Sequence, residues 1–163
     1  MPRPVLSAVT TAPSSQKDCF LYIYNTHTGE FFKDVYRSRG IYLPESLEML
    51  NRILRDYRTG EVTRIDPELF DLLHAIQSGV QTKEAYHVVS AYRTRETNEY
   101  LRKIGRKVAR NSLHIAGKAV DVYLPDVALS TLRKKAVQLR SGGVGYYRRN
   151  HFVHIDTGNI RYW

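Results

Sequence analysis

Histidine and aspartate residues in the C-terminal half of the chain are spaced as a metal site would require. His114 precedes Asp121 by seven residues, and Gly117 between them can let the chain turn so that the two side chains approach. The run from 152 to 156, Phe-Val-His-Ile-Asp, alternates apolar and polar residues as a strand does. Such alternation points the histidine and the aspartate of this run to one face and the apolar residues to the other. Two histidines, His114 and His154, and one aspartate can thus converge.

Zinc takes ligands of these two types. Neutral imidazole and carboxylate both donate to Zn²⁺ at about 2.0 to 2.2 Å, and a catalytic zinc keeps three protein ligands with a fourth position open to water. His114, Asp121 and His154 fit such a set. On spacing alone an ordinary fold is favoured, in which His114 belongs to a loop, Asp121 to an exposed strand position and His154 to the core.

The segments around these residues contain several predicted strands. Residues 20–25 and 30–37 are rich in β-branched and aromatic residues, and the polar connection that ends in Gly29 indicates a hairpin. Further strands are predicted at 86–92, 118–124 and about 152–156. Three glycines are predicted to break the chain before the last of these strands: Gly142, Gly143 and Gly145.

Helices are predicted between these strands. Pro44 and Pro67 each precede apolar residues at helical spacing, and both segments are predicted to be amphipathic helices that pack on a core. Two more helices are predicted at 94–104 and 128–140, the second with basic residues in its last turn. No internal repeat and no second domain boundary is visible. The predicted strands and helices indicate an α+β fold class, with helices packed on a mostly antiparallel sheet.

Length and composition favour one globular domain at residues 19–163. The chain has 163 residues, 42% of them hydrophobic, which suffices for a core without disulfides. Cys19 is the only cysteine, so an internal disulfide and a cysteine-based zinc site are excluded. Residues 1–18 are predicted to be a disordered lead without the apolar region of a secretory signal. No apolar stretch approaches the ~18 residues that a transmembrane segment needs.

The chain is basic, with 25 Lys and Arg against 16 Asp and Glu and a formal net charge of +9. Such a surface attracts anions, including nucleic acid, acidic lipids and anionic wall polymers. Because the basic residues are spread along the whole chain, a solvated basic face is favoured, and no nucleic-acid partner is expected. We expect a monomer.

The motif Ser112-x-His114-x-x-Gly117-x-Ala119-x-Asp121 resembles the SxHxxGxAxD motif of the D-Ala-D-Ala carboxypeptidase and dipeptidase group. The superfamily of that group also holds lysostaphin-like enzymes and the hedgehog signalling domain. Further segments resemble murein endopeptidase K and its relatives, so that the likeness covers nearly everything from residue 20 onward. These segments are 22–29, 47–66, Ser90-Ala-Tyr-Arg93, Gly142-Gly-Val-Gly-Tyr-Tyr147 and 154–163.

The resemblance implies a hedgehog-like or D-Ala-D-Ala peptidase-like fold and a zinc ion held by His114, Asp121 and His154. It also implies that Arg93 faces the substrate carbonyl beside the metal, where a guanidinium can stabilise the developing oxyanion. Ser112 matches a position that contacts substrate in the dipeptidases, and it equally fits a role in satisfying backbone groups of its loop.

The proton acceptor is left open by the resemblance. The dipeptidases carry an ExxH pair that ends in the third ligand, whereas this chain has His151-x-x-His154 and no glutamate there. We expect His151 to take a proton from the water at the metal, since the unperturbed pKa of histidine suits neutral pH. Asp156 is the second candidate, and we expect it rather to orient a ligand.

The function predicted is hydrolysis of an amide in a peptidoglycan stem peptide or cross-link by a zinc metallopeptidase. D,D-endopeptidase, L,D-endopeptidase and carboxypeptidase activity all remain open, and the periplasm or another exported location is expected, with cytoplasmic action on wall fragments as the alternative. One rival is a catalytically inactive zinc-containing module that binds the wall or a partner. Another is a non-haem iron site built on His154-Ile-Asp156, which ranks low because no histidine follows it.

Overall fold

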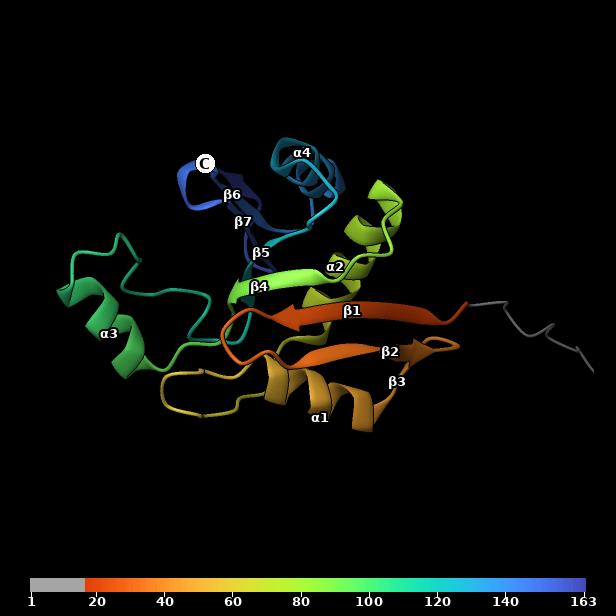
Figure 1. Ribbon diagram of the computed structural model, residues 1–163, viewed down its shortest axis with the longest axis horizontal. Coiled ribbons are helices and arrows are strands. Elements are labelled where there is room, and N and C mark those ends of the chain that lie inside the picture. The colour runs from red at the N-terminus through yellow and green to blue at the C-terminus, as the bar shows by residue number, and fades with distance from the viewer. Residues whose placement is uncertain (1–16) are drawn as a thin grey trace, which may run out of the picture.

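One mixed sheet of eight strands runs through residues 17–163, the part of the chain that the computed structural model describes (Figure 1). The strand order is β3-β2-β1-β4-β5-β7-β6-β8, and all neighbours are antiparallel except β1 with β4 and β6 with β8. The predicted α+β class with a mostly antiparallel sheet is confirmed. The strands are β1 Cys19–Asn25, β2 Phe31–Ser38, β3 Ile41–Tyr42, β4 Tyr86–Ser90, β5 Ala119–Tyr123, β6 Gly143–Tyr147, β7 Phe152–Asp156 and β8 Arg161–Tyr162.

The predicted disordered lead, residues 1–18, lies outside the described residues except for Lys17 and Asp18. Asp18 accepts a 2.6 Å hydrogen bond from the Ser38 hydroxyl, at the start of the β1–β2 hairpin.

Four α-helices lie at the predicted places in the described part of the chain. They are α1 Pro44–Ile53, α2 Pro67–Val80, α3 Arg95–Lys103 and α4 Leu129–Leu139, and a short 3₁₀ turn, η1, covers Arg148–Asn150. Proline opens α1 and α2, and the Thr94 hydroxyl caps α3 by accepting from the Thr97 N–H. The prediction of basic residues in the last turn of α4 is wrong, because Arg140 is already the C-cap residue. None of the helices between residues 17 and 163 is long and apolar enough to span a bilayer.

Alternation along the strands separates a core face of the sheet from a face that carries polar residues. Val120 and Val122 of β5 and Val153 and Ile155 of β7 are buried in one apolar cluster with residues of α1, α2 and α4. The residues between them point the other way, to the surface that we call the site face; it includes Asp121, His154 and Asp156. The predicted alternation at 152–156 is therefore confirmed, and the core lies behind the candidate ligands.

Gly142 lies in the bend before strand β6, as predicted, but Gly143 and Gly145 form part of that strand and do not break the chain, so the prediction is wrong for these two. A Cβ atom at Gly143 would lie 2.5 Å from Asp156 Oδ2, and one at Gly145 would lie 2.7 Å from the Trp163 ring. Strand β6 pairs with β7 and, in parallel, with β8. The glycines therefore make room for side chains that lie across β6 on the site face.

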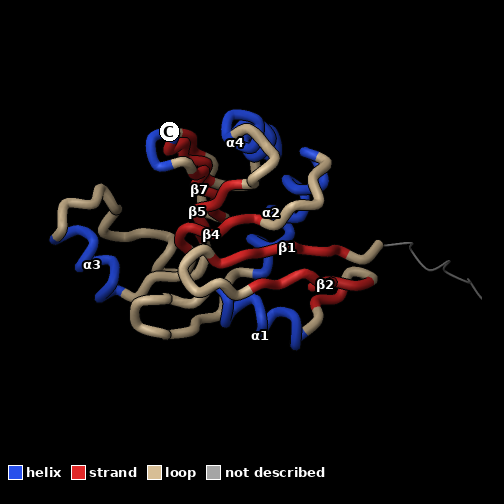
Figure 2. Tube along the Cα trace, in the orientation of Figure 1, coloured by secondary structure: helices blue, strands red, loops and turns tan. Residues whose placement is uncertain are grey.

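Helix α3 and the loop after it stand at one end of the sheet, apart from α1, α2 and α4 (Figures 1 and 2). The loop occupies residues 104–118 and carries His114. Its course is fixed from α3 by the buried side chain of Asn98, whose amide donates a 3.0 Å hydrogen bond to the Ala109 carbonyl. An irregular segment is thus held in place by a buried polar group, as a precise ligand position requires.

Replacing Gly145 by alanine should displace Trp163, the only tryptophan of the chain. The added methyl group meets a rigid ring, so we expect a loss of about 1 to 3 kcal/mol of stability, typical of overpacking, together with a shift in intrinsic fluorescence. Urea unfolding and the emission spectrum measure the two effects.

Gly79→Ala in helix α2 is the matched control. Its Cβ meets only the flexible end of Lys135, and alanine favours the helix by roughly 0.5–1 kcal/mol. We expect the control to keep the parental emission spectrum. If Gly145→Ala also kept it, the close approach of the ring to β6 would be contradicted.

Candidate metal centre

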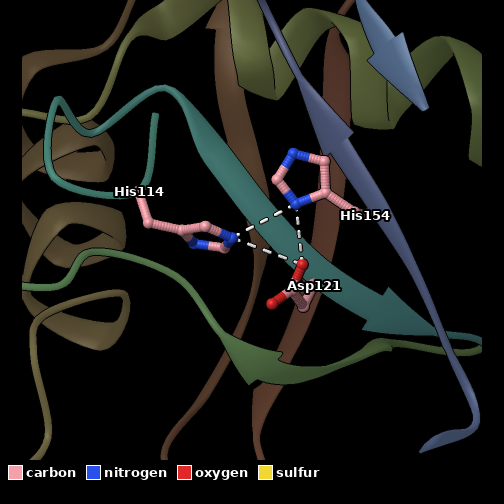
Figure 3. Close-up of side chains that lie close together, drawn as sticks. All are labelled: His114, Asp121 and His154. Carbon is pink, nitrogen blue, oxygen red and sulfur yellow. Dashed lines mark hydrogen bonds and ion pairs between the residues drawn. The ribbon is translucent and has the colours of Figure 1, made fainter. Parts of the chain in front are cut away.

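Three side chains meet on the site face, with their donor atoms turned toward one point (Figure 3). His154 Nδ1 lies 2.9 Å from Asp121 Oδ1, and His114 Nε2 lies 3.3 Å from the same oxygen. The two imidazole nitrogens are 3.2 Å apart. All three ligand atoms lie within 4.8 Å of one another, and each residue is buried. The structure therefore brings together the three predicted metal ligands.

Two of these residues are placed by strand pairing. Asp121 on β5 and His154 on β7 are direct partners in the antiparallel ladder, so their side chains leave the sheet side by side on the same face. The pairing of β4 with β5 brings Ser90 opposite Asp121. The apolar residues on either side of each ligand hold both strands in this register, because a slip by one residue would turn the ligands into the core.

The third residue, His114, is placed by its loop. Its Nδ1 lies 2.7 Å from the Ala91 carbonyl, and its own carbonyl accepts from the Arg93 N–H at 3.2 Å. Gly117 adopts a φ of +66°, and a Cβ atom there would lie 2.8 Å from the Arg64 carbonyl oxygen. The turn between His114 and Asp121 therefore requires a positive φ and the absence of a side chain. Glycine meets both requirements, as predicted from the sequence.

The protonation pattern leaves free electron pairs at the centre of the cluster. The Ala91 carbonyl can only accept, so His114 Nδ1 carries the proton and the neutral ring turns its Nε2 lone pair inward. Likewise, His154 Nε2 donates to Asp156 Oδ2 at 2.9 Å, which leaves Nδ1 for the centre. Two imidazole nitrogens and one carboxylate oxygen then face one point, the donor set that suits a divalent ion such as zinc.

Asp156 supports His154 from behind. It is fully buried, and its Oδ1 accepts from the backbone N–H groups of Gly143 at 3.0 Å and Gly158 at 2.9 Å. Arg161 binds both of its oxygens, at 3.2 and 2.7 Å. The Asp156 carboxylate is thus fully hydrogen-bonded and closed to solvent, so it holds the ring of His154 in one orientation.

Burial and neighbouring charges act in opposite directions on these groups. Burial alone would raise the pKa of Asp156, but hydrogen bonds from His154, Gly158 and Gly143 lower it to about 2. For Asp121 the two imidazoles likewise outweigh burial and hold its pKa well below the usual range. Burial lowers the pKa of His114, whereas in His154 the contacts with two carboxylates outweigh burial and raise the pKa. Both acids are therefore carboxylates at neutral pH.

A pocket of about 760 Å³ opens over the three ligands, and both predicted substrate-contacting residues line it. Arg93 is buried, and its Nε has no hydrogen-bond partner among the described residues. Its Nη2 lies 3.5 Å from Ser112 Oγ, which also accepts from the His114 N–H at 3.3 Å. Burial lowers the pKa of Arg93, an effect that the charge of Asp121 partly offsets. Ser112 thus serves its loop and contacts the arginine.

Two aromatic residues that the sequence left without a role also line the pocket: Tyr147 and Trp163. The Trp163 ring lies 5.3 Å from the His154 ring, and its Nε1 donates to the Tyr147 hydroxyl at 2.9 Å. Glycine at alternate positions of β6 is the signal that could have revealed this arrangement, since a strand lacks side chains on one face where others must lie. Tyr146, on the opposite face, packs against the core.

His151 lies elsewhere on the site face. It caps η1 with a left-handed backbone, φ 57°, and its exposed ring contacts the Tyr123 ring edge-on at 5.2 Å. Tyr123 in turn contacts His87, so the ring of His151 ends a row of aromatic side chains. The lining of the pocket in the described chain does not include His151. The structure therefore does not bring it together with the three ligands.

Comparison with known proteins gives the family. The family model described as peptidoglycan L,D-endopeptidase MepK matches residues 13–163. The peptidoglycan L,D-endopeptidase MepK of Escherichia coli strain K12 is 42% identical over 164 residues, which cover 100% of this chain and 87% of that protein. The probable peptidoglycan L,D-endopeptidase MepK of Haemophilus influenzae is 37% identical over 164 residues, 86% of its length. No solved structure gave a significant match.

The match spans the hairpin, the helices and all three candidate ligands, and it confirms the resemblance drawn from the SxHxxGxAxD motif. Both the family and its named members are peptidases. The chain belongs to the peptidoglycan L,D-endopeptidase MepK family.

Proposed function

We propose that this protein is a zinc-dependent endopeptidase that hydrolyses an amide bond between an L- and a D-configured centre in peptidoglycan peptides. The observation that carries the proposal is the convergence of His114, Asp121 and His154 beneath a pocket that also contains a buried arginine. The names of the relatives support the substrate and the L,D specificity. Among the bonds left open by the sequence, an L,D bond is therefore preferred to a D,D cross-link or a terminal residue.

In this proposal, zinc is held by His114 Nε2, Asp121 Oδ1 and His154 Nδ1. Zinc bound there supplies a Lewis acid for the scissile carbonyl and lowers the pKa of water to about 7. Arg93 reaches the same pocket with an unpartnered Nε, so it can donate to the carbonyl oxygen on which negative charge develops. Ser112 keeps the Arg93 guanidinium and the His114 backbone in place.

Asp156 and Arg161 act on the metal site through His154. The Asp156 carboxylate accepts a hydrogen bond from the Nε2–H of His154, which fixes the tautomer that a metal ligand needs. Arg161 donates a hydrogen bond to each oxygen of this carboxylate in a bidentate contact. We assign Asp156 a positioning role and not that of a proton acceptor.

A zinc-containing module that binds wall peptides without turnover is the second candidate. It is favoured by one observation: Asp121 is the only acidic residue that lines the pocket within the described chain, and it is itself a proposed ligand. Digestion of purified wall material separates the two functions. Release of new muropeptides with zinc supports the peptidase, whereas binding to the wall without release, with or without zinc, supports the module.

We place the peptidase domain at residues 19–163 and its action in the periplasm, where a peptidoglycan substrate would lie. The net charge of +9 would hold the protein near an anionic wall polymer by an attraction that added salt weakens.

The first prediction for the site concerns Asp121→Asn. The amide keeps the size of the side chain but removes the charge that neutralises part of the metal dication, so we expect zinc affinity to fall more than about 100-fold and turnover to be lost. Zinc content after dialysis, cooperative thermal unfolding and muropeptide release are measured on one preparation. Asp34→Asn, at an exposed position of β2, is the control and should change stability by less than roughly half a kcal/mol. Normal zinc retention in Asp121→Asn would remove this residue from the site.

The second prediction concerns Asp156→Asn. An amide NH₂ directed at His154 would favour the tautomer with the proton on Nδ1, which has no lone pair for a metal. We expect zinc affinity to fall about 10- to 100-fold, as is typical when the partner of a ligating histidine is changed. Competition with a chromophoric chelator gives the dissociation constant. Arg161→Gln leaves the bond between His154 and Asp156 in place and should weaken zinc binding less, so equal effects of the two variants would contradict the positioning role.

The third prediction concerns His151→Gln. Its place against Tyr123, outside the pocket lining, leads us to expect kcat within about twofold of the parent protein. A general base contributes about 10²- to 10⁴-fold to a rate. A loss of that size in the pH range where histidine titrates would instead establish the proton-transfer role expected from the sequence.

A further inference from the structure

The wall of the pocket carries a large excess of positive charge. Its basic residues are Arg58, Arg93, Arg106, Lys107 and Arg161, while Asp121 is its only acid within the described chain. Arg161 is paired with Asp156, but the four other cations form no ion pair among residues 17–163. One metal ion would add further positive charge. A site of this composition favours an anionic ligand over a neutral one.

Arg58 differs from an ordinary surface arginine because its guanidinium lies on an aromatic support. The centre of the guanidinium lies 4.3 Å from the centroid of the Tyr57 ring. The Tyr57 ring also stacks on the ring of His27, with centroids 3.8 Å apart and an interplanar angle of 14°. His27 is held in turn by a 2.9 Å contact from Nε2 to the Val89 carbonyl. This stack limits the freedom of an exposed cation at the pocket rim.

A buried aspartate connects the segment of Arg58 with that of Arg93. Asp56 Oδ1 accepts from the Arg58 N–H at 3.0 Å, and Oδ2 accepts from the Thr94 N–H at 2.9 Å and the Thr94 hydroxyl at 3.1 Å. Thr94 follows Arg93 directly in the chain. Because Asp56 is 1% exposed, it fixes the two arginine-bearing segments relative to one another. One side chain thus fixes the backbone at two arginines that both line the pocket.

We infer that Arg58 is a specificity-determining residue that binds a free carboxylate of the substrate at the Tyr57 side of the pocket, beside the scissile amide. The inference rests on the proposed function, since the peptide part of a wall polymer offers carboxylates as its anionic groups. Arginine suits this task because its planar donors match a carboxylate in a bidentate contact. Arg93, buried above the ligands, remains available for the carbonyl oxygen.

The test compares two synthetic stem peptides that contain one L,D amide bond. One has all its carboxylates free, and in the other they are amidated. Both are assayed for kcat/KM with zinc, and their dissociation constants are measured by calorimetry with a chelator present, so that binding is read without turnover. The variants are Arg58→Gln, which removes the charge, and Arg58→Lys, which keeps the charge but not the planar donors.

We expect Arg58→Gln to lower kcat/KM for the free-carboxylate peptide about tenfold, mainly through KM, and to weaken its binding with chelator to a similar extent. The amidated peptide should bind the parent protein weakly and lose much less in the variant. Arg58→Lys should recover part of the loss. Arg52→Gln, which removes the same charge at an exposed position of α1 outside the pocket lining, should leave the preference intact.

The possible failures are distinguishable. Equal effects of Arg58→Gln on the two peptides, or no effect on either, overturn the inference even if the protein is an active peptidase. Carboxylate-dependent and Arg58-dependent binding without any cleavage upholds the inference and contradicts the proposed function.

Discussion

The register between strands β5 and β7 is the constraint on which the rest of the site depends. It sets Asp121 directly opposite His154, and the buried Val or Ile residues on either side of each anchor both strands in the core. Since side chains alternate between the two faces of a sheet, a shift by one residue would bury both polar groups among apolar ones. The cost of such burial is large, so the hydrophobic core itself selects the register that forms the site.

Each buried polar group of the site also needs a partner on its far side. His114 has the Ala91 carbonyl, and His154 has Asp156, which in turn has Arg161 and two backbone N–H groups. These outer groups accept hydrogen bonds from the ring N–H groups, so that the other ring nitrogens turn only lone pairs toward the centre of the cluster. A cluster of this kind is incomplete without a positive charge, either a proton shared between His154 and Asp121 or a metal ion. The same buried arrangement therefore explains the raised pKa of His154 and the affinity for a cation that we propose.

The sequence predicted those parts of the molecule that depend on local pattern. Alternation in residues 152–156 gave the face of His154, and Gly117 marked the turn that His114 needs, because both signals lie within a few residues. The sequence did not predict β6, whose glycines are explained by Asp156 and Trp163 packing across them. Asp156 reaches β6 through the pairing of β6 with β7, and Trp163 through the parallel pairing of β6 with β8. These are contacts between segments separated along the chain, whereas glycine in isolation indicates only a turn.

The position of His151 shows the limit of sequence spacing, since His151 is close to a ligand in sequence but its ring contacts Tyr123 and does not line the pocket. His151 itself has a left-handed backbone, which directs its ring toward Tyr123. Sequence spacing carries no information on this change of chain direction. Trp163, which lies nine residues after His154, instead contacts it directly.

The division of the sheet into two faces separates stability from chemistry. Apolar side chains of α1, α2 and α4 pack on the core face, whereas the ligands, Arg93 and the pocket wall belong to the other face or to loops at the end of the sheet. Hydrophobic burial supplies most of the free energy of folding, and it is unchanged when a polar group on the site face is replaced by one of similar size. Loops fixed by Asp56 and Asn98 carry the pocket wall, so its charge can vary while the metal ligands stay on the strands and on the anchored His114. A scaffold of this kind allows the metal site to be retained while the specificity for substrate changes, because the two are attached to different parts of the fold.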